Sequence, residues 1–151
     1  MPELNILIPG APIAKKRPRF ARRGKFVTTY NPQETEEGRM LWEIKQQLPA
    51  GWTPIKNPIR IDTIFYIGRP KHHYGTGKNK RKLKKSSPLL HISKPDIDNL
   101  QKMVYDCFNQ VVWVDDSLVC ETHSRKEYSE NPRTEITVME FRDGTRTEEG
   151  I

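Results

Sequence analysis

The chain has 151 residues, which suits a single domain with its own core, and we expect one domain over residues 1–151. A formal net charge of +7 favours a polyanionic partner. No apolar run is long enough to cross a membrane, no signal peptide is evident, and the two cysteines form no zinc-type pair. We therefore expect no membrane partner, no zinc site, and buried, reduced thiols at Cys107 and Cys120 in a cytoplasmic protein.

The first half of the chain predicts two strands on either side of a helix. Residues 3–8 alternate in hydropathy and end at a Pro-Gly turn, which predicts a strand. Asn31 can cap a helix that starts with Pro32 and carries an apolar stripe to about residue 47. Residues 58–67 again alternate, which predicts a strand with one face in the core.

The second half predicts a short strand at 89–93, a helix that starts beside Asp96, and strands at 117–128 and 134–141. A turn at 129–132 separates the last two strands, so we expect them to form a hairpin. Residues 142–151 are polar and are expected to be a flexible tail. The predicted elements follow the approximate order β-α-β-α-β-β, which fits the α+β class.

Two acid-free segments, 14–25 and 71–85, carry 14 of the 26 Lys and Arg residues. The remaining 12 are outnumbered by 19 acidic residues, so the basicity is local, as in a nucleic-acid footprint. Proline and glycine make the first segment a loop or ribbon rather than a helix. We predict phosphate contacts from Lys15, Lys16, Arg17, Arg19, Arg22, Arg23, Lys78, Lys80, Arg81, Lys82, Lys84 and Lys85.

The second segment also contains two histidines and two glycines, which are residue types that can indicate a metal site or a nucleotide site. His72 and His73 are expected to be loop residues or phosphate contacts rather than metal ligands. The run from Gly75 to Lys78 suggests a P-loop, but Asn79 stands where that motif needs Ser or Thr, so we expect no nucleotide cofactor.

The segment from Lys94 to Val119 carries the candidate chemistry. Asp96 and Asp98 lie at the start of the predicted helix, Lys102 follows one turn later, and Asp115-Asp116 comes after the helix. Carboxylate oxygens suit Mg²⁺, and a nearby lysine can neutralise charge on a phosphate in the transition state. A structural alternative stays open on spacing alone: Asp96 can cap the helix, Lys102 can pair with Asp98, and Asp115-Asp116 can form a turn.

Together, the runs K-P-D-I-D-N-L-Q-K at 94–102 and W-V-D-D-S-L-V at 113–119 resemble the RusA family of Holliday-junction resolvases. The resemblance extends to Pro9-Gly10, to 16–19, to the loop at 74–78 and to Lys126-x-Tyr128, so it spans most of residues 4–141. Pro95 departs from the family, because some members carry a basic residue there, and Lys94 is the nearest substitute in this chain.

The resemblance implies a mixed sheet flanked by two helices, which agrees with the predicted order of elements. It also implies a homodimeric endonuclease that depends on Mg²⁺, which Mn²⁺ can replace, and that nicks four-way DNA junctions symmetrically. By motif position, Asp96, Asp98 and Asp116 match the metal-binding aspartates and Lys102 matches the functional lysine. Lys94 and Lys126 join the expected DNA contacts.

Three other functions compete with this one. The same residues suit a nuclease for flaps or nicks, or a DNA-binding module without catalysis, although that module would not need all four key residues. An Asp-x-Asp glycosyltransferase would not explain two acid-free basic segments.

Overall fold

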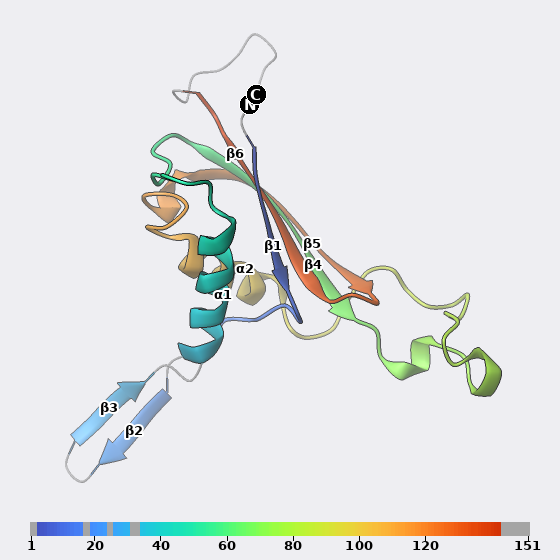
Figure 1. Cartoon of the computed structure of the whole chain (residues 1–151). Coiled ribbons are helices and arrows are strands. Elements are labelled where there is room, and N and C mark those ends of the chain that lie inside the picture. Colours follow the sequence, from blue (N-terminus) through green and yellow to red (C-terminus); the bar gives the residue numbers. More distant parts are fainter. Residues whose placement is uncertain (1–2, 17–18, 24–25, 31–33, 143–151) are drawn as a thin grey trace.

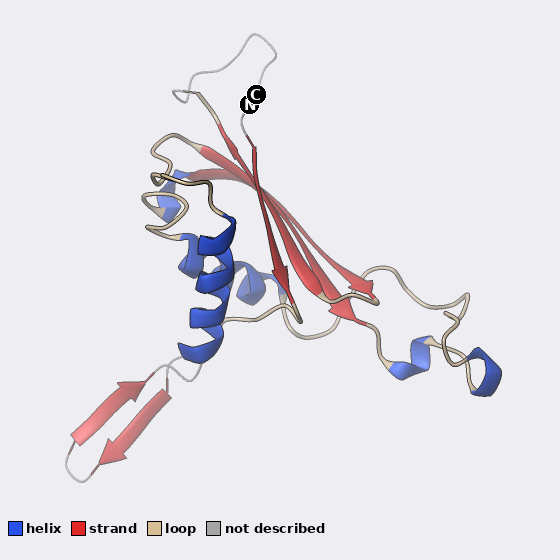
Figure 2. Cartoon of the chain, viewed as in Figure 1, coloured by secondary structure: helices blue, strands red, loops and turns tan. Residues whose placement is uncertain are grey.

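The computed structural model describes residues 3–16, 19–23, 26–30 and 34–142. Its centre is a four-stranded mixed sheet with two helices on one face (Figures 1 and 2), which confirms the predicted α+β class. The sheet has the order β1-β6-β4-β5, made of β1 (Glu3–Pro9), β4 (Ile59–Gly68), β5 (Val119–Ser129) and β6 (Arg133–Glu140). The helices are α1 (Glu34–Gln47) and α2 (Ile97–Phe108), and β2 (Arg19–Arg23) with β3 (Phe26–Tyr30) forms a separate antiparallel ribbon.

One core lies between the sheet and the helices. The strands contribute the apolar side chains that alternate onto one face, and α2 contributes its apolar stripe. In β4, Ile59, Ile61 and Phe65 are fully buried, as the period of two predicts. In α2, Leu100 and Phe108 are fully buried on the stripe predicted from helical spacing. The remaining buried apolar residues of β1, β6, both helices and the loop after α2 join the same cluster. The helix that carries the candidate chemistry is therefore fixed by its apolar face.

The last two strands do not form the hairpin that their short connection predicts. β6 pairs antiparallel with β1 and β4, and β5 pairs in parallel with β4, so β4 lies between β5 and β6. The β5–β6 connection crosses the end of β4, where a Cβ placed on Gly68 would lie 3.4 Å from the ring of Pro132. β4 has the most continuous buried face, so it occupies an interior position and pairs on both edges.

Other expectations also need correction. Residues 89–93 are not a strand, since only Leu90 forms a bridge, to Glu127. Cys107 is buried as expected, but Cys120 is exposed. The predicted cap at Asn31 and most of the expected tail lie outside the described residues. Within the part of the chain that the structure describes, no helix is long and apolar enough to span a bilayer.

The face of the sheet opposite the helices is covered by paired charges. Arg60 binds Asp62 at 3.0 Å and Arg133 binds Glu135 at 2.9 Å. The guanidinium of Arg133 also lies 3.8 Å from the ring centroid of Tyr66. These charges neutralise one another, so this face offers little net positive charge for a polyanion.

Candidate active site

The N-terminus of α2 presents two exposed carboxylates. Asp96 occupies the N-cap position, yet its side chain makes no capping hydrogen bond. Asp98 lies in the first turn, and its Oδ1 accepts a hydrogen bond from the backbone N–H of Asn99 at 2.9 Å. The structural role considered for Asp96, a side-chain cap, is therefore not found, and both carboxylates keep oxygens free for a ligand.

Lys102 follows Asp98 by one helical turn and is exposed. Among the described residues it forms no ion pair, so the surface pair with Asp98 that spacing allows is absent. Its ammonium is not committed to a structural partner. It is free to meet an anion brought to the start of α2.

The second acidic pair lies in a one-turn 3₁₀ helix, Asp116–Leu118. Asp115 accepts a hydrogen bond from the backbone N–H of Ser117 at 2.9 Å, and this bond lowers the pKa of Asp115. Asp116 is half-buried and accepts a 2.7 Å hydrogen bond from Nε1 of the fully buried Trp113. Asp115 thus forms the predicted turn, whereas Asp116 is oriented by the core.

The environment of Asp116 favours its protonated form. Burial raises the pKa of Asp116 most, and the nearby charges of Asp106 and Asp115 raise it further. The hydrogen bond from Trp113 opposes this shift. A carboxylate with a raised pKa gains from a bound cation, because the cation compensates for lost hydration and acidic neighbours.

The three predicted ligands do not meet in one cluster. Within the described residues, no group of three or more His, Cys, Asp or Glu side chains is placed to hold a metal ion. The exposed pair Asp96 and Asp98 nonetheless fits Mg²⁺, which often binds one or two carboxylates and takes its other ligands from water and phosphate. The participation of Asp116 stays a prediction.

Lys126, one of the expected DNA contacts, makes hydrogen bonds inside the fold, and its phosphate contact stays a prediction. Its Nζ donates hydrogen bonds to the carbonyl oxygens of Ser93 at 2.8 Å and Pro95 at 2.9 Å. Pro95 directly precedes Asp96, so a lysine of β5 fixes the segment that leads into the carboxylate pair. Its partners within the fold are carbonyl groups.

Lys15 also makes contacts inside the fold, and its expected phosphate contact stays a prediction. Its Nζ lies 2.6 Å from Glu37 and 3.0 Å from Asp106, which joins the segment after β1 to both helices. Burial lowers the pKa of Lys15, but its hydrogen bonds to these two carboxylates outweigh that effect and leave the pKa raised. Its backbone N–H also donates to the carbonyl of Asn99 at 2.9 Å, close to Asp98.

The second basic segment is an exposed arm, residues 71–85, which we call the basic arm (Figure 1). Backbone hydrogen bonds join Gly75 to Lys82 at 3.0 Å and Lys84 to His73 at 2.9 Å, so the arm closes on itself. A Cβ on Gly75 would lie 2.6 Å from that of Asn79, which explains this glycine without a nucleotide site. The arm's cationic side chains are exposed, and none forms an ion pair with another described residue: Lys71, Lys78, Lys80, Arg81, Lys82, Lys84 and Lys85.

The remaining predicted DNA contacts have different outcomes. Lys94 is exposed and unpaired within the described chain, and Lys16 is exposed. Arg17 lies outside the described residues. Arg19, Arg22 and Arg23 belong to β2, where the structure describes only the backbone. Their phosphate contacts stay predictions.

An aromatic cluster at the base of the basic arm was missed by sequence reasoning. The rings of His73 and His91 pack edge-to-face on Tyr128, with centroids 4.6 and 5.0 Å away. Arg69 lies over the same ring at 5.4 Å and donates to the carbonyl of Pro88 at 2.7 Å. Both histidines are buried, so the expectation of a loop or phosphate role for His73 is wrong. Apolar and polar residues alternate only weakly in these parts of the sequence, and nothing in the sequence indicates that the three rings contact one another.

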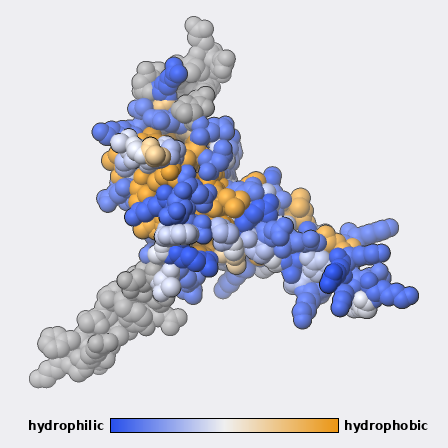
Figure 3. All heavy atoms as spheres, in the orientation of Figure 1, coloured by the Kyte–Doolittle hydropathy of each residue, from blue (hydrophilic) through white to orange (hydrophobic). Residues whose placement is uncertain are grey.

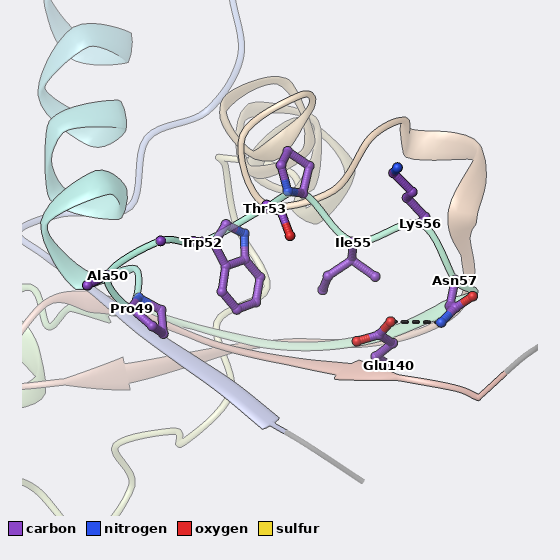
Figure 4. Close-up of a pocket in the computed structure, with 10 residues that line it drawn as sticks. Pro49, Ala50, Trp52, Thr53, Ile55, Lys56, Asn57 and Glu140 are labelled. Atoms are coloured by element: carbon purple, nitrogen blue, oxygen red, sulfur yellow. Dashed lines mark hydrogen bonds between the residues drawn. The ribbon is translucent and has the colours of Figure 1, made fainter.

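A surface groove lies elsewhere, along the segment after α1 (Figure 4). It is bounded by Asn57 and Glu140, which share a 2.9 Å hydrogen bond, and by Trp52, whose Nε1 donates to Val112 at 3.3 Å. It contains none of the predicted site residues. The chemistry-bearing residues instead lie on an open surface, which suits a large substrate rather than a small molecule.

Comparison with known proteins agrees with this arrangement. Residues 9–139 match the family described as endodeoxyribonuclease RusA. The chain is also 32% identical over 131 residues to the uncharacterized protein YqaN of Bacillus subtilis (strain 168). That alignment covers 87% of this chain and 92% of YqaN.

Proposed function

Because this chain belongs to the RusA endodeoxyribonuclease family, we propose that it cleaves four-way DNA junctions in a metal-dependent reaction. The observation that carries the proposal is the exposed pair Asp96 and Asp98 with the unpaired Lys102 one turn along α2. Two hard oxygen donors beside a free ammonium suit a divalent cation and a phosphodiester.

In this proposal each site residue has a defined task. Asp96 and Asp98 hold Mg²⁺, for which Mn²⁺ can substitute, and Asp116 contributes a further carboxylate. The bound cation polarises the scissile phosphate and lowers the pKa of a water molecule. Lys102 stabilises negative charge on the phosphate, and Lys126 keeps Asp96 in place through the carbonyl of Pro95. Burial and the neighbouring Asp106 and Asp115 raise the pKa of Asp116, and a cation bound beside it would favour its ionised form.

The basic surfaces favour a branched substrate. The basic arm and the β2–β3 ribbon extend from the sheet in different directions (Figure 1), and hydrophilic side chains dominate the arm (Figure 3). Two separated projections can follow two duplex arms and contact phosphates without reading bases. A single compact basic patch, in contrast, would fit one unbranched duplex as well as it fits a junction.

We also propose a two-fold homodimer, because one chain offers one carboxylate pair and junction resolution needs two symmetry-related nicks. Met139, in β6, and Phe141, just after it, are half-buried, so they offer little exposed apolar surface for such a dimer. Apolar side chains gather on the visible surface over the helix layer (Figure 3). On α1, the side chain of Trp42 is exposed.

The test is incubation of the protein with end-labelled four-way junction and with duplex of matched sequence, with and without Mg²⁺. We expect paired nicks in the junction only when Mg²⁺ is present, and sedimentation as a dimer. Equal nicking of both substrates would favour the alternative, a less selective nuclease for flaps or nicks. Binding without cleavage under all conditions would favour the non-catalytic module.

A further inference from the structure

Ile92 is exposed to a degree unusual for a large apolar residue. Its side chain is 94% exposed, more than any other exposed large hydrophobic residue of the described chain. Leu89 and Leu90 in the same segment are also exposed, at 60% and 49%. A large apolar side chain left in water forgoes the free energy of burial, so a rigidly held example indicates a binding partner.

The segment around Ile92 is held on both sides by β5. Before it, the backbone N–H of His91 donates to the carbonyl of Lys126 at 3.1 Å, and the ring of His91 is buried against Tyr128. After it, the carbonyl of Ser93 accepts from Lys126 Nζ at 2.8 Å. Ile92 therefore projects from a fixed support between two attachment points.

The surroundings of Ile92 match DNA rather than a second copy of the chain. Lys94 lies two residues after it, and the basic arm ends seven residues before it at Lys85. Both lysines are exposed and form no ion pair with another described residue. Two copies that met through this segment would bring like charges together, whereas a phosphate backbone on either side of Ile92 would neutralise them.

We propose that Ile92 is a specificity-determining wedge that enters the base stack at the branch point of the DNA. Apolar side chains inserted between base steps unstack them and kink the duplex. Unstacking is easiest where the stack is already interrupted, so a wedge four residues before Asp96 favours a branch point over continuous duplex. This inference rests on the proposed nuclease function, which it deepens by assigning a residue to substrate choice.

The test uses junctions that carry 2-aminopurine beside the branch point. The fluorescence of this base rises when it unstacks, so binding of the unaltered protein without Mg²⁺ should raise the signal. Ile92→Ser should remove that rise, and Ile92→Leu should restore it. In Mg²⁺, Ile92→Ser should lower the ratio of junction to duplex nicking about tenfold, as expected when one apolar side chain loses its buried site.

Leu7→Ser is the matched control, because Leu7 is also exposed but lies on β1 at the opposite edge of the sheet. It should change neither fluorescence nor substrate ratio. If the unaltered protein nicks junctions but Ile92→Ser keeps the full signal and ratio, the wedge is refuted and the nuclease stands. If Ile92→Ser converts a dimer into a monomer, the segment is an interface between copies and the wedge is again refuted. If the unaltered protein neither binds nor nicks junctions, both proposals fail.

Discussion

Lys126 Nζ lies 2.9 Å from the carbonyl oxygen of Pro95, so a basic residue of β5 is bound to the backbone directly before Asp96. The same ammonium also binds the carbonyl of Ser93, on the other side of Lys94. One side chain thus holds the carbonyl groups on both sides of Lys94, in the short segment that joins Ile92 to Asp96. Its charge is bound by carbonyl groups of the fold, whereas the lysines of the basic arm are exposed.

We predict that Lys126→Met lowers the turnover of junction nicking at least about tenfold, because Met keeps the stem but loses both hydrogen bonds of the charged ammonium, each worth about 1.5–3 kcal/mol. The salt dependence of DNA binding should stay unchanged, since both of these bonds lie inside the fold. Filter binding over a range of salt concentrations, with single-turnover nicking, measures both effects. Lys126→Arg, which keeps the donors, should recover part of the turnover. A flatter salt slope for Lys126→Met would instead support its role as a DNA contact.

Asp98→Asn should abolish nicking and leave junction binding intact or tighter. The change removes the negative charge needed for Mg²⁺, while the amide keeps the size of the side chain and one acceptor oxygen for the N–H of Asn99. Nicking and gel-shift assays give the two readings. Asp62→Asn is the matched control, since Asp62 binds Arg60 on the charge-paired face of the sheet, and it should retain activity. Normal nicking by Asp98→Asn would remove this residue from the site.

Sequence reasoning located the carboxylate helix because local periodicity determines it. Ile97, Leu100 and Phe108 define the apolar side of α2, and that choice alone puts Asp98 and Lys102 in solvent. The same reasoning also found the alternating face of β4. These features depend on residues close together in the chain.

Sequence reasoning did not find contacts between residues that are distant in the chain. Lys126 and Pro95 are 31 residues apart, and Lys15 meets Asp106 only after both helices have packed. Charge alone cannot distinguish a lysine that will find a carbonyl from one that will stay in solvent. Likewise, a short turn at Pro132 favours a hairpin locally. The sheet, however, has the strand β4, with its buried apolar face, between β5 and β6.

Lys102→Ala should reduce turnover much more than it reduces thermal stability. Lys102 is exposed and unpaired within the described chain, so its loss removes less than the roughly 0.3–0.5 kcal/mol of an exposed helical ion pair. We propose that Lys102 stabilises the negative charge that develops on the phosphate in the transition state. Steady-state nicking and thermal melting test this together, with Lys45→Ala on α1 as the exposed control. A large fall in melting temperature with unchanged turnover would show that Lys102 is structural.

Replacing the basic cluster of the arm should weaken junction binding in a salt-dependent way. Each phosphate neutralised contributes about −0.9 to the log–log slope of affinity against salt. The variant replaces five exposed residues with Gln: Lys80, Arg81, Lys82, Lys84 and Lys85. Its slope should be shallower by several units if most of these side chains contact phosphate. An unchanged slope would place the DNA surface elsewhere.

The attachment of the basic arm should weaken as pH falls below the ordinary histidine range. Burial lowers the pKa of His73, with further lowering from His72, Arg69 and Lys84, and burial and Lys126 lower the pKa of His91. The unfolded chain, whose histidines titrate near 6.5, therefore binds more protons than the folded chain below that pH. The stabilisation is complete above pH 6.5 and declines as pH falls toward the lowered folded-state values.

Melting temperatures should therefore decrease as pH is lowered from 7.5 to 5.5, and amide protection factors, which correct for the slower intrinsic exchange at low pH, should fall first in residues 71–93. A variant with both His73→Gln and His91→Gln should lose this pH dependence, although its packing on Tyr128 will be weaker at every pH. His123→Gln is the control, because His123 is exposed on β5 and touches Glu121 rather than the arm. It should retain the decline. If the double variant declines as steeply as the unaltered protein, protonation of these two rings does not control the base of the arm.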